Sequence, residues 1–504
     1  MEEGKPAWEH WQAVNVMALR DGIGYAPMPP GNPAGRKSRD ILNVCCAFDI
    51  ETTRLPDLDQ AFCYHWQFQY GPDRPTIYGR ELWEFRKFLD GLQATLGDRE
   101  TLYIFVHNLS YEFHFLRGVY PEIDNKDVFS VKPRKPIKVK LYDGKIELRC
   151  SYVLTNMGLD TWTAKMQVEH GKLSGAAYDY TKIRYPWTPL TDLEKQYCRN
   201  DVLGLVEALQ RQLDVYGDTL ATLVLTSTGY VRRDVKRCMR QWSWKALQNL
   251  QPTAPVYLAL RAAFRGGNAH ASRFYTGKII PDVGSMDRSS SYPDVCCNQP
   301  FPMGKFQRSL PETKKHLDKL RKEGRAILLH FYCENLRLRD EWNPCPYISY
   351  SKIEGPKEKY CETDNGRILY APWAEMTVTD LDLDIIEKDY KWDNFKILDM
   401  WDTRYGELPN ILRALIIKYY RDKTRLKGVE GEEVYYDKAK ALLNSIYGLQ
   451  AQDPCKADTI YNPDPDAEHD LFMTKEGDIL AKLMKSRRQP YTGYQIGVWV
   501  CAWA

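Results

Sequence analysis

A seven-residue stretch in the middle of the chain, Asp287–Pro293 (Asp-Arg-Ser-Ser-Ser-Tyr-Pro), limits most strongly what the surrounding sequence can fold into. The run before it, residues 277–283, predicts the end of a hairpin that leads into a strand with Asp287 at its tip. Tyr292 and Pro293 then predict a turn into a helix, because proline fixes φ and suits a first helical position. A carboxylate at a strand tip, followed by the backbone N–H groups of a helix, suits a divalent cation and a polyphosphate. Taken alone, the stretch is more simply a solvated aspartate in a serine-rich turn, because short motifs match by chance.

A short apolar run nearer the N-terminus also ends in carboxylates. Asn43–Glu51 predicts a strand that Thr52 and Thr53 bring to an end. Asp49 and Glu51 share one face of it, because residues two apart on a strand point the same way. Two carboxylates so placed repel each other unless a cation lies between them. An Asp-x-Glu pair on an edge strand without any ligand is the simpler alternative for this run by itself.

A second apolar run, Leu102–Val106, predicts another buried strand. A helix follows it, which Ser110 is expected to cap, so that Glu112 lies in the first turn. Negative charge is favoured there, and Glu112 could serve the helix dipole alone.

A third segment predicts a long helix from its first residues. Thr191 and Glu194 form a capping box. Tyr197 and Asp201 are four residues apart and therefore lie on one face of this helix. A buried aspartate on an otherwise apolar face needs a partner.

A fourth segment, Lys440–Gly448, predicts a helix with a polar and aromatic face. Lys440, Asn444 and Tyr447 are spaced at i, i+4 and i+7, which places them on one side. That side offers a cation, an amide and an aromatic ring, and an ordinary amphipathic helix is a poor explanation of the whole pattern.

Composition narrows the class of protein. The 504 residues suggest about three domains. No apolar run reaches the roughly 18 residues of a membrane span, and the N-terminus does not begin like a signal peptide. Thirteen cysteines without a Cys-x-x-Cys spacing favour reduced thiols over a zinc module or a disulfide framework. A net charge of +3 excludes a polycation, so contact with nucleic acid would depend on local basic patches.

The N-terminal segments together resemble a known family. Phe48-Asp49-Ile50-Glu51-Thr52, His107-Asn108-Leu109-x-Tyr111-Glu112 and Tyr197-x-x-x-Asp201 resemble the three exonuclease motifs of DnaQ-like 3′→5′ proofreading domains. The His-Asn-Leu form is similar, more narrowly, to the protein-primed, phage-type branch of family B DNA polymerases. Glu112 stands where the best-known members of that branch carry Asp, and it keeps a hard oxygen ligand at the position.

The resemblance implies hydrolysis with two metal ions. Two Mg²⁺ (or Mn²⁺) ions would be held by Asp49, Glu51, Glu112 and Asp201. Tyr197 would orient the attacking water, and Lys172 would face the scissile phosphate. The unpaired 3′ end of DNA would be gripped by Thr52, Asn108 and Tyr111, although Tyr111 is equally plausible as a plain core aromatic.

The C-terminal segments resemble polymerase motifs. Phe264-Arg265-Gly266-Gly267 is similar to the Tyr-x-Gly-Gly linker, with Phe in place of Tyr, which implies that Gly266 and Gly267 approach DNA closely. Asp287 to Pro293 matches motif A, in which Asp287 is a palm carboxylate that binds metal. By the same match, Ser290 and Ser291 offer backbone N–H groups to a triphosphate, and Tyr292 excludes a 2′-hydroxyl. Lys440–Gly448 matches motif B, which implies nucleotide contacts for Lys440, Asn444 and Tyr447.

One motif of the family is not found. Motif C, a Tyr-x-Asp-Thr-Asp hairpin, does not occur in the 504 residues. In the family the thumb comes after motif C, so we expect the thumb to be missing as well. We therefore expect a complete exonuclease and an incomplete polymerase. The explanations left open are a truncated gene or protein, one half of a split polymerase whose partner supplies motif C and the thumb, and a degraded prophage gene.

These observations give one overall interpretation. We expect a multidomain α/β and α+β chain: an N-terminal arm (1–42), an RNase H-like 3′→5′ exonuclease domain (43–235), and partial palm and fingers of a right-hand polymerase (236–504). The function expected is DNA-directed DNA synthesis with proofreading. The expected partners are primer–template DNA, dNTPs and a terminal protein primer, in the cytoplasm of a phage-bearing or prophage-bearing bacterial host, without a membrane. A stand-alone 3′→5′ exonuclease and a non-catalytic DNA-binding remnant are the alternatives.

Overall fold

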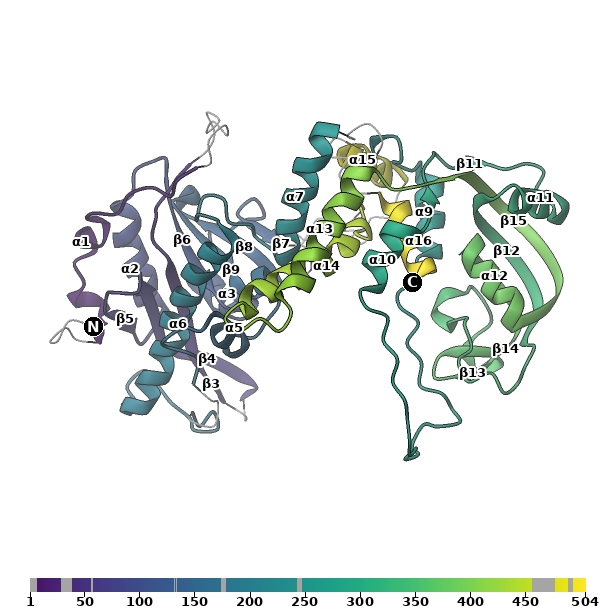
Figure 1. Cartoon of the computed structure of the whole chain (residues 1–504). Coiled ribbons are helices and arrows are strands. Elements are labelled where there is room, and N and C mark those ends of the chain that lie inside the picture. The colour runs from purple at the N-terminus through teal and green to yellow at the C-terminus, as the bar shows by residue number, and fades with distance from the viewer. Residues whose placement is uncertain are drawn as a thin grey trace. The chain divides into compact units, whose positions relative to one another are not determined.

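The structure, a computed structural model, describes residues 7–28, 39–55, 58–130, 132, 134–173, 178–242, 247–455, 476–487 and 493–504. The chain divides into two compact units (Figure 1). The first consists of Met1–Gly229, Gly428–Tyr435 and Ala457–Phe472, and the second of the remaining residues. No helix in the described part of the chain is long and apolar enough to cross a membrane.

A nine-stranded mixed sheet forms the centre of the first unit, in the order β1-β5-β4-β3-β6-β9-β8-β7, with β2 also paired to β6. The central strands β3, β6 and β9 run parallel, and the neighbouring β4 and β8 are antiparallel to them. The strands are β1 (Trp8–His10), β2 (Asp40–Ile41), β3 (Cys46–Leu55), β4 (Gln60–Tyr70), β5 (Thr76–Gly79), β6 (Glu100–Val106), β7 (Val128–Ser130), β8 (Pro136–Leu141) and β9 (Ile146–Cys150). The helices are α1 (Val16–Arg20), α2 (Leu82–Ala94), α3 (Leu109–Val119), α4 (Ser151–Thr155), α5 (Leu159–Met166) and α6 (Asp192–Tyr216).

The alternation of side chains along β3 assigns a different role to each face of the sheet. Phe48 points to the face covered by α2, where its ring stacks on Phe85 at 3.9 Å between centroids. Asp49 and Glu51 point to the opposite face, against which α6 packs. Because side chains alternate on a strand, an apolar core on one face leaves the carboxylates together on the other.

Two local expectations differ from the structure. Thr52 and Thr53 do not end the strand, because β3 continues to Leu55 in a ladder with β4. Ser110 does not cap α3, because the cap position is taken by Asn108 in the left-handed conformation (φ 71°), which asparagine tolerates well.

Residues 1–42 also differ from the expected extended arm where they are described. β1 pairs with β5, and the ring of Trp8 packs against those of His65 and Tyr78. This aromatic contact buries apolar surface that an arm would leave in water.

The second unit contains a six-stranded antiparallel sheet beside a group of helices. The strand order is β10-β15-β12-β14-β13, with β11 also paired to β15. Figure 1 shows the long strands with α11 and α12, which pack against them. The strands are β10 (Phe301–Pro302), β11 (Gln307–Arg308), β12 (Arg325–Leu338), β13 (Glu362–Asp364), β14 (Arg367–Thr379) and β15 (Tyr390–Gly406).

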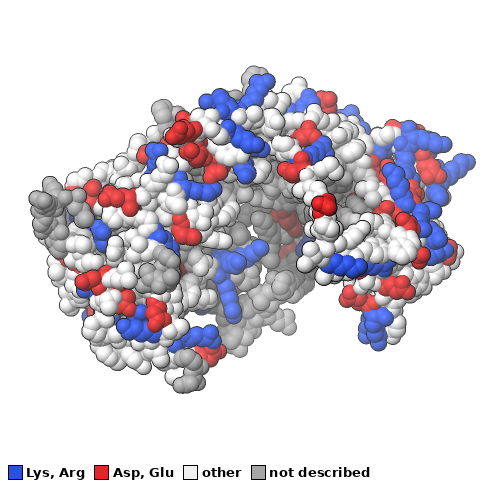
Figure 2. All heavy atoms as spheres, turned by 60° about the horizontal axis from the view of Figure 1, so that its bottom comes forward, with Lys and Arg blue, Asp and Glu red and all other residues white. Residues whose placement is uncertain are grey.

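The helices of the second unit form their own core around Tyr257, Trp499 and Leu443. They are α7 (Ser227–Trp242), α9 (Ala254–Ala263), α10 (Ser291–Asn298), α11 (Lys314–Lys322), α12 (Asp380–Asp389), α13 (Asn410–Leu426), α14 (Glu433–Gln450), α15 (Glu476–Arg487) and α16 (Tyr494–Trp503). The first residues of α7 and of α14 are assigned to the first unit. On the face shown in Figure 2, Lys and Arg side chains are interspersed with Asp and Glu side chains, in keeping with the small net charge.

Candidate active site

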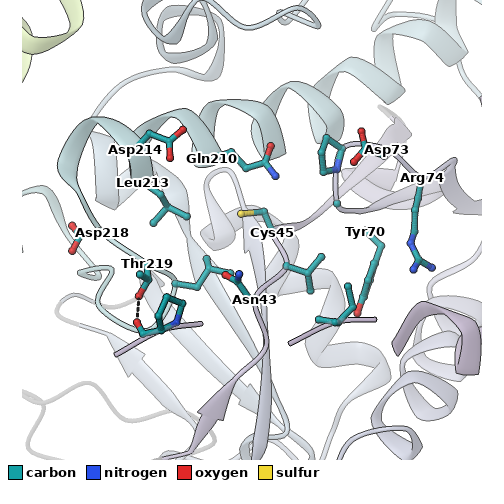
Figure 3. A pocket seen from close by; sticks show the side chains of 16 residues that line it. Asn43, Cys45, Tyr70, Asp73, Arg74, Gln210, Leu213, Asp214, Asp218 and Thr219 are labelled. Carbon is teal, nitrogen blue, oxygen red and sulfur yellow. Dashed lines mark hydrogen bonds between the residues drawn. The ribbon is translucent and has the colours of Figure 1, made fainter. Parts of the chain in front are cut away.

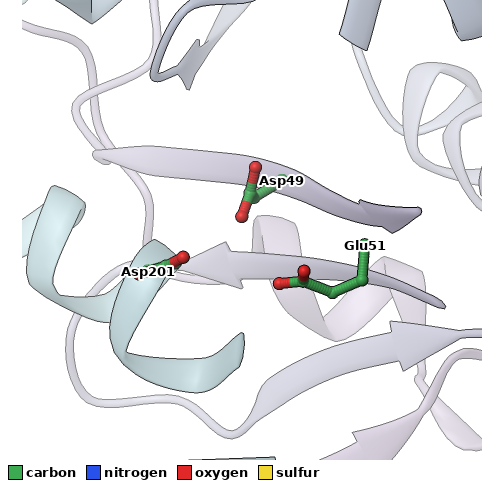
Figure 4. A group of neighbouring side chains, drawn as sticks. All are labelled: Asp49, Glu51 and Asp201. Atoms are coloured by element: carbon green, nitrogen blue, oxygen red, sulfur yellow. The ribbon is translucent and has the colours of Figure 1, made fainter. Parts of the chain in front are cut away.

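Three carboxylates meet on the α6 side of the first sheet (Figure 4). Asp49 and Glu51 come from β3, and Asp201 comes from the third turn of α6. Each offers a ligand oxygen, and these oxygens all lie within 4.8 Å of one another. The parallel ladder between β3 and β6 ends at Ala47, so the carboxylates lie just past it. Hard oxygen ligands at this spacing suit a divalent cation.

The electrostatics of the cluster favour a bound cation. Burial raises the pKa of Asp49, and burial together with the charge of Asp49 raises that of Glu51 well above its usual range. Burial, and then Asp49, raise the pKa of Asp201 to about 7. Like charges in a poorly hydrated site oppose one another's ionisation, and a cation between them removes that penalty.

Glu112 lies next to this cluster. It is in the first turn of α3, is buried, and lies beside Asp49, whose charge adds to burial in raising the pKa of Glu112. Its Oε2 atom has no hydrogen-bond partner among the described residues. A buried carboxylate oxygen without a partner fits a position where a cation or a water would bind.

Lys172 and Tyr197 border the cluster on the α6 side. Lys172 Nζ donates to Asp201 Oδ2 at 3.0 Å. Burial alone would lower the pKa of this ammonium group, but the carboxylate of Asp201 raises it. The ring of Tyr197 is buried and packs on that of Tyr178 at 4.7 Å, and its hydroxyl bonds to that of Tyr180. The spacing i, i+4 predicted from the sequence therefore does place Tyr197 and Asp201 together.

The residues expected to grip a DNA end lie at the rim. The hydroxyl groups of Thr52 and Tyr111 are hydrogen-bonded, although they are 59 residues apart in the chain. Tyr111 is 42% exposed, so it is not a core aromatic, and Asn108 is exposed at the start of α3. An exposed ring beside buried carboxylates is available for stacking.

Gln67 is a member of this site that the sequence analysis missed. It lies on β4 directly opposite Asp49, and its Nε2 donates to Asp49 Oδ2 at 3.1 Å and to Glu51 Oε1 at 3.3 Å. Only the register between β3 and β4 reveals this contact. A glutamine inside an apolar strand is the one signal that the sequence offered.

A cavity of the first unit is separate from the carboxylates. Figure 3 shows it, a cavity of about 600 Å³ beside the C-terminal end of α6, where Thr219 Oγ1 donates to the carbonyl oxygen of Pro27 at 2.8 Å. Neither Asp49, Glu51 nor Asp201 lines it. The carboxylate cluster therefore lies outside this cavity.

In the second unit, the expected strand before Asp287 is absent. The described residues 277–289 have no strand pairing, and Asp287 is exposed. The apolar side chains there are exposed as well, with Ile279 at 98% and Met286 at 102%. A strand needs a neighbouring backbone to satisfy its N–H and C=O groups, and none of the described segments pairs with this run as a strand.

The residues that follow Asp287 do meet residues of the C-terminal segments. The helix begins at Ser291, so Pro293 is its third residue rather than its first. The rings of Tyr292 and Tyr447 stack at 4.1 Å and are nearly parallel (4°), and Lys423 Nζ donates to Ser290 Oγ at 2.9 Å.

Of the remaining predicted positions, Gly267 lies next to this stacked pair. A Cβ atom on Gly267 would approach the hydroxyl of Tyr292 at 3.4 Å, and Gly266 next to it is exposed. Lys440 and Asn444 are exposed on α14, the helix that carries Tyr447. Among the described residues, Asp287 does not form a group of three potential metal ligands with other acidic, His or Cys side chains.

Comparisons with known proteins agree with this architecture. Residues 165–482 match the family model described as "DNA polymerase type B, organellar and viral". Among solved structures, Phi29 DNA polymerase with primer-template DNA has a TM-score of 0.66 at 17% identity, over 92% of this chain and 75% of that one. The same polymerase with single-stranded DNA gives 0.64 at 18% identity (92% and 75%), and its ternary complex with incoming nucleotides gives 0.61 at 18% (92% and 76%). No curated protein sequence matches the chain. The fold of this chain thus resembles that of Phi29 DNA polymerase.

Proposed function

Because the chain belongs to the type B DNA polymerases of organelles and viruses, we propose that it replicates DNA of a phage or mobile element by adding deoxynucleotides to a 3′ end, and removes mispaired ends by 3′→5′ hydrolysis. The first unit is the exonuclease, an RNase H-like domain, and the second contributes palm and fingers. The substrates are primer–template DNA and dNTPs, with a terminal protein as primer, in the cytoplasm of the host. The observation that carries the proposal is the convergence of Asp49, Glu51 and Asp201.

The exonuclease site would hold two Mg²⁺ ions through Asp49, Glu51, Glu112 and Asp201. When bound, such ions supply a hydroxide nucleophile at neutral pH and stabilise the charge on the leaving 3′ oxygen. The fit rests on carboxylates that repel one another and on Oε2 of Glu112, which has no hydrogen-bond partner in the described part of the chain.

The side chains around the cluster position the substrate. The ammonium group of Lys172 is close enough to Asp201 to donate to a phosphate oxygen held at the cluster, where charge develops in the transition state. Tyr197 orients the water through its hydroxyl, and Thr52, Asn108 and Tyr111 hold the last unpaired nucleotides by hydrogen bonds and stacking.

The second unit would bind the incoming nucleotide. The stacked rings of Tyr292 and Tyr447 provide a flat surface for the sugar and the new base pair. Lys440, Asn444 and the backbone N–H groups of Ser290 and Ser291 surround the triphosphate, while Gly266 and Gly267 let the DNA backbone approach closely. Asp287 supplies a carboxylate for the metal. The unpaired segment before it, with its exposed apolar side chains, is the place where a polypeptide carrying further carboxylates would add a strand.

A second candidate function follows from Asp287. Among the described residues, Asp287 does not belong to a cluster of potential metal ligands. In this second function the chain by itself is an exonuclease, and its second unit only clamps DNA.

The experiment that tests the proposal is incubation of the chain with a 5′-labelled primer annealed to a template, in Mg²⁺, with and without dNTPs. Shortening of the primer without dNTPs is the expected result. Extension with dNTPs would assign synthesis to this chain alone, whereas shortening under both conditions would support the exonuclease that needs another polypeptide for synthesis. An unchanged primer under both conditions would contradict the proposal.

A further inference from the structure

The amide group of Gln67 bridges the two carboxylates of β3. Its nitrogen donates to one oxygen of Asp49 and one of Glu51, at 3.1 and 3.3 Å. We propose that Gln67 is a positioning residue of the metal site: it holds one oxygen of each carboxylate so that the other oxygen of each faces the cation. The inference rests on the proposed function, because it concerns the same cluster.

The chemistry of an amide suits this task better than that of a cation. Asp49 and Glu51 repel each other, and a donor between them lowers that repulsion. A lysine or arginine in its place would neutralise the carboxylates and compete with a divalent ion. An amide donates without carrying charge, so it can order the ligands while their negative charge stays available to the metal.

Packing alone does not account for the glutamine. Its side chain is fully buried in β4, and its oxygen Oε1 has no hydrogen-bond partner among the described residues. Burying an amide that is only partly satisfied costs stability, and an apolar side chain at the position would avoid the cost. The two bonds to the carboxylates are the gain that the structure shows for it.

Gln69 provides a matched control on the same face of the same strand. Its amide nitrogen donates to the carbonyl oxygens of Gly71 and Arg74, at 2.6 and 2.8 Å, and its oxygen accepts from Thr76. These bonds close the connection between β4 and β5 and do not reach the carboxylates. A loss of fold stability and a loss of metal-site order can therefore be separated by comparing the two glutamines.

The test is calorimetric titration of Mg²⁺, and separately of Mn²⁺, into the full chain without DNA. Gln67→Met keeps the length of the side chain and removes the donor, and is expected to weaken Mg²⁺ binding by about 10- to 100-fold. The loss should be smaller for Mn²⁺, because Mg²⁺ demands near-ideal octahedral geometry. Gln69→Met is expected to lower the melting temperature and to leave the Mg²⁺ affinity within about twofold of wild type.

Each outcome bears on the inference. Unchanged Mg²⁺ affinity in Gln67→Met, or an equal loss in Gln69→Met, would overturn it while leaving the proposed exonuclease site intact. If the wild-type chain bound no Mg²⁺, the proposed metal site itself would fail. Gln67→Thr, a β-branched residue that suits a strand and is too short to reach both carboxylates, repeats the test should Gln67→Met not fold.

Discussion

At the scale of single residues, Lys172 places a positive charge beside the carboxylate cluster. Its ammonium group bonds to Asp201 and lies 5.4 Å from the centroid of the Tyr197 ring. We predict that Lys172→Met slows removal of 3′ nucleotides by about 100- to 1,000-fold, since one donor to a developing charge is lost. Single-turnover degradation of a labelled strand measures this. Lys195→Met, on the exposed side of α6, is the control and should have no effect; equal rates for both variants would remove Lys172 from the reaction.

His65 gives the first unit a defined sensitivity to acid. Burial, and then the charge of Arg80, lower its pKa to about 3, and both ring nitrogens lack partners among the described residues. The pKa of His65 is lower in the folded state than its unfolded value of about 6.5. Its contribution to the free energy of unfolding is therefore fully present above pH 6.5 and is lost as the pH falls toward 3. The loss attributable to this residue is about 4 kcal/mol at pH 3.

The variant His65→Phe tests this predicted loss of stability at low pH. It removes the titration and keeps a ring between Trp8 and Tyr78. Urea unfolding at pH 7 and pH 4 should show a smaller loss of stability on acidification in the variant than in wild type. A parallel loss in the two proteins would show that His65 does not titrate on unfolding.

At the scale of the element, the capping box of α6 both caps the helix at its first turn and supplies a partner to a buried arginine. Thr191 and Glu194 cap its first turn, and Glu194 also pairs with Arg184, which is 2% exposed. We predict that Thr191→Ala costs about 1 kcal/mol, as the loss of an N-cap does. Glu194→Ala should cost about 3–5 kcal/mol, because it leaves a buried guanidinium without its carboxylate. Urea unfolding followed through the first unit gives both values, and equal costs would show that the ion pair adds nothing.

Local signals explain which elements could be predicted from the sequence. The capping box at Thr191 and the apolar run of Leu102–Val106 are signals that lie within the element they predict. The structure has a helix and a strand there. The expected strand before Asp287 failed because a strand depends on a neighbour distant in the sequence. Gln67 was missed for a related reason, since its contact to Asp49 exists only in one register of two strands.

The residues of the site could likewise be predicted where motifs identified them. Asp49, Glu51 and Asp201 were identified by spacing and resemblance, and they converge in the structure. The roles assigned to them, and to the residues of the second unit, stay predictions.

At the scale of the whole molecule, the chain has two units with separate hydrophobic cores. Substitutions in one unit are therefore expected to leave the chemistry of the other intact, since distant sites behave additively.

Tyr447 tests this independence. In an Asp49→Ala/Glu51→Ala background, Tyr447→Ala should weaken binding of a labelled dNTP to the chain with primer–template about 10- to 100-fold, as loss of an aromatic stacking surface does. Tyr420→Ala, exposed on α13, is the control. With the carboxylates restored, Tyr447→Ala should degrade single strands at the wild-type rate; a large fall in that rate would show that the two sites are coupled.

The most direct test of the central claim is the rate at which the chain shortens a 5′-labelled single-stranded DNA in Mg²⁺, compared with that of Asp49→Ala/Glu51→Ala. We predict stepwise shortening from the 3′ end by the wild-type chain, none in EDTA, and none by the double variant, because two of the clustered metal ligands are gone. Shortening by the double variant at the wild-type rate would contradict the assignment of the carboxylate cluster as the exonuclease site.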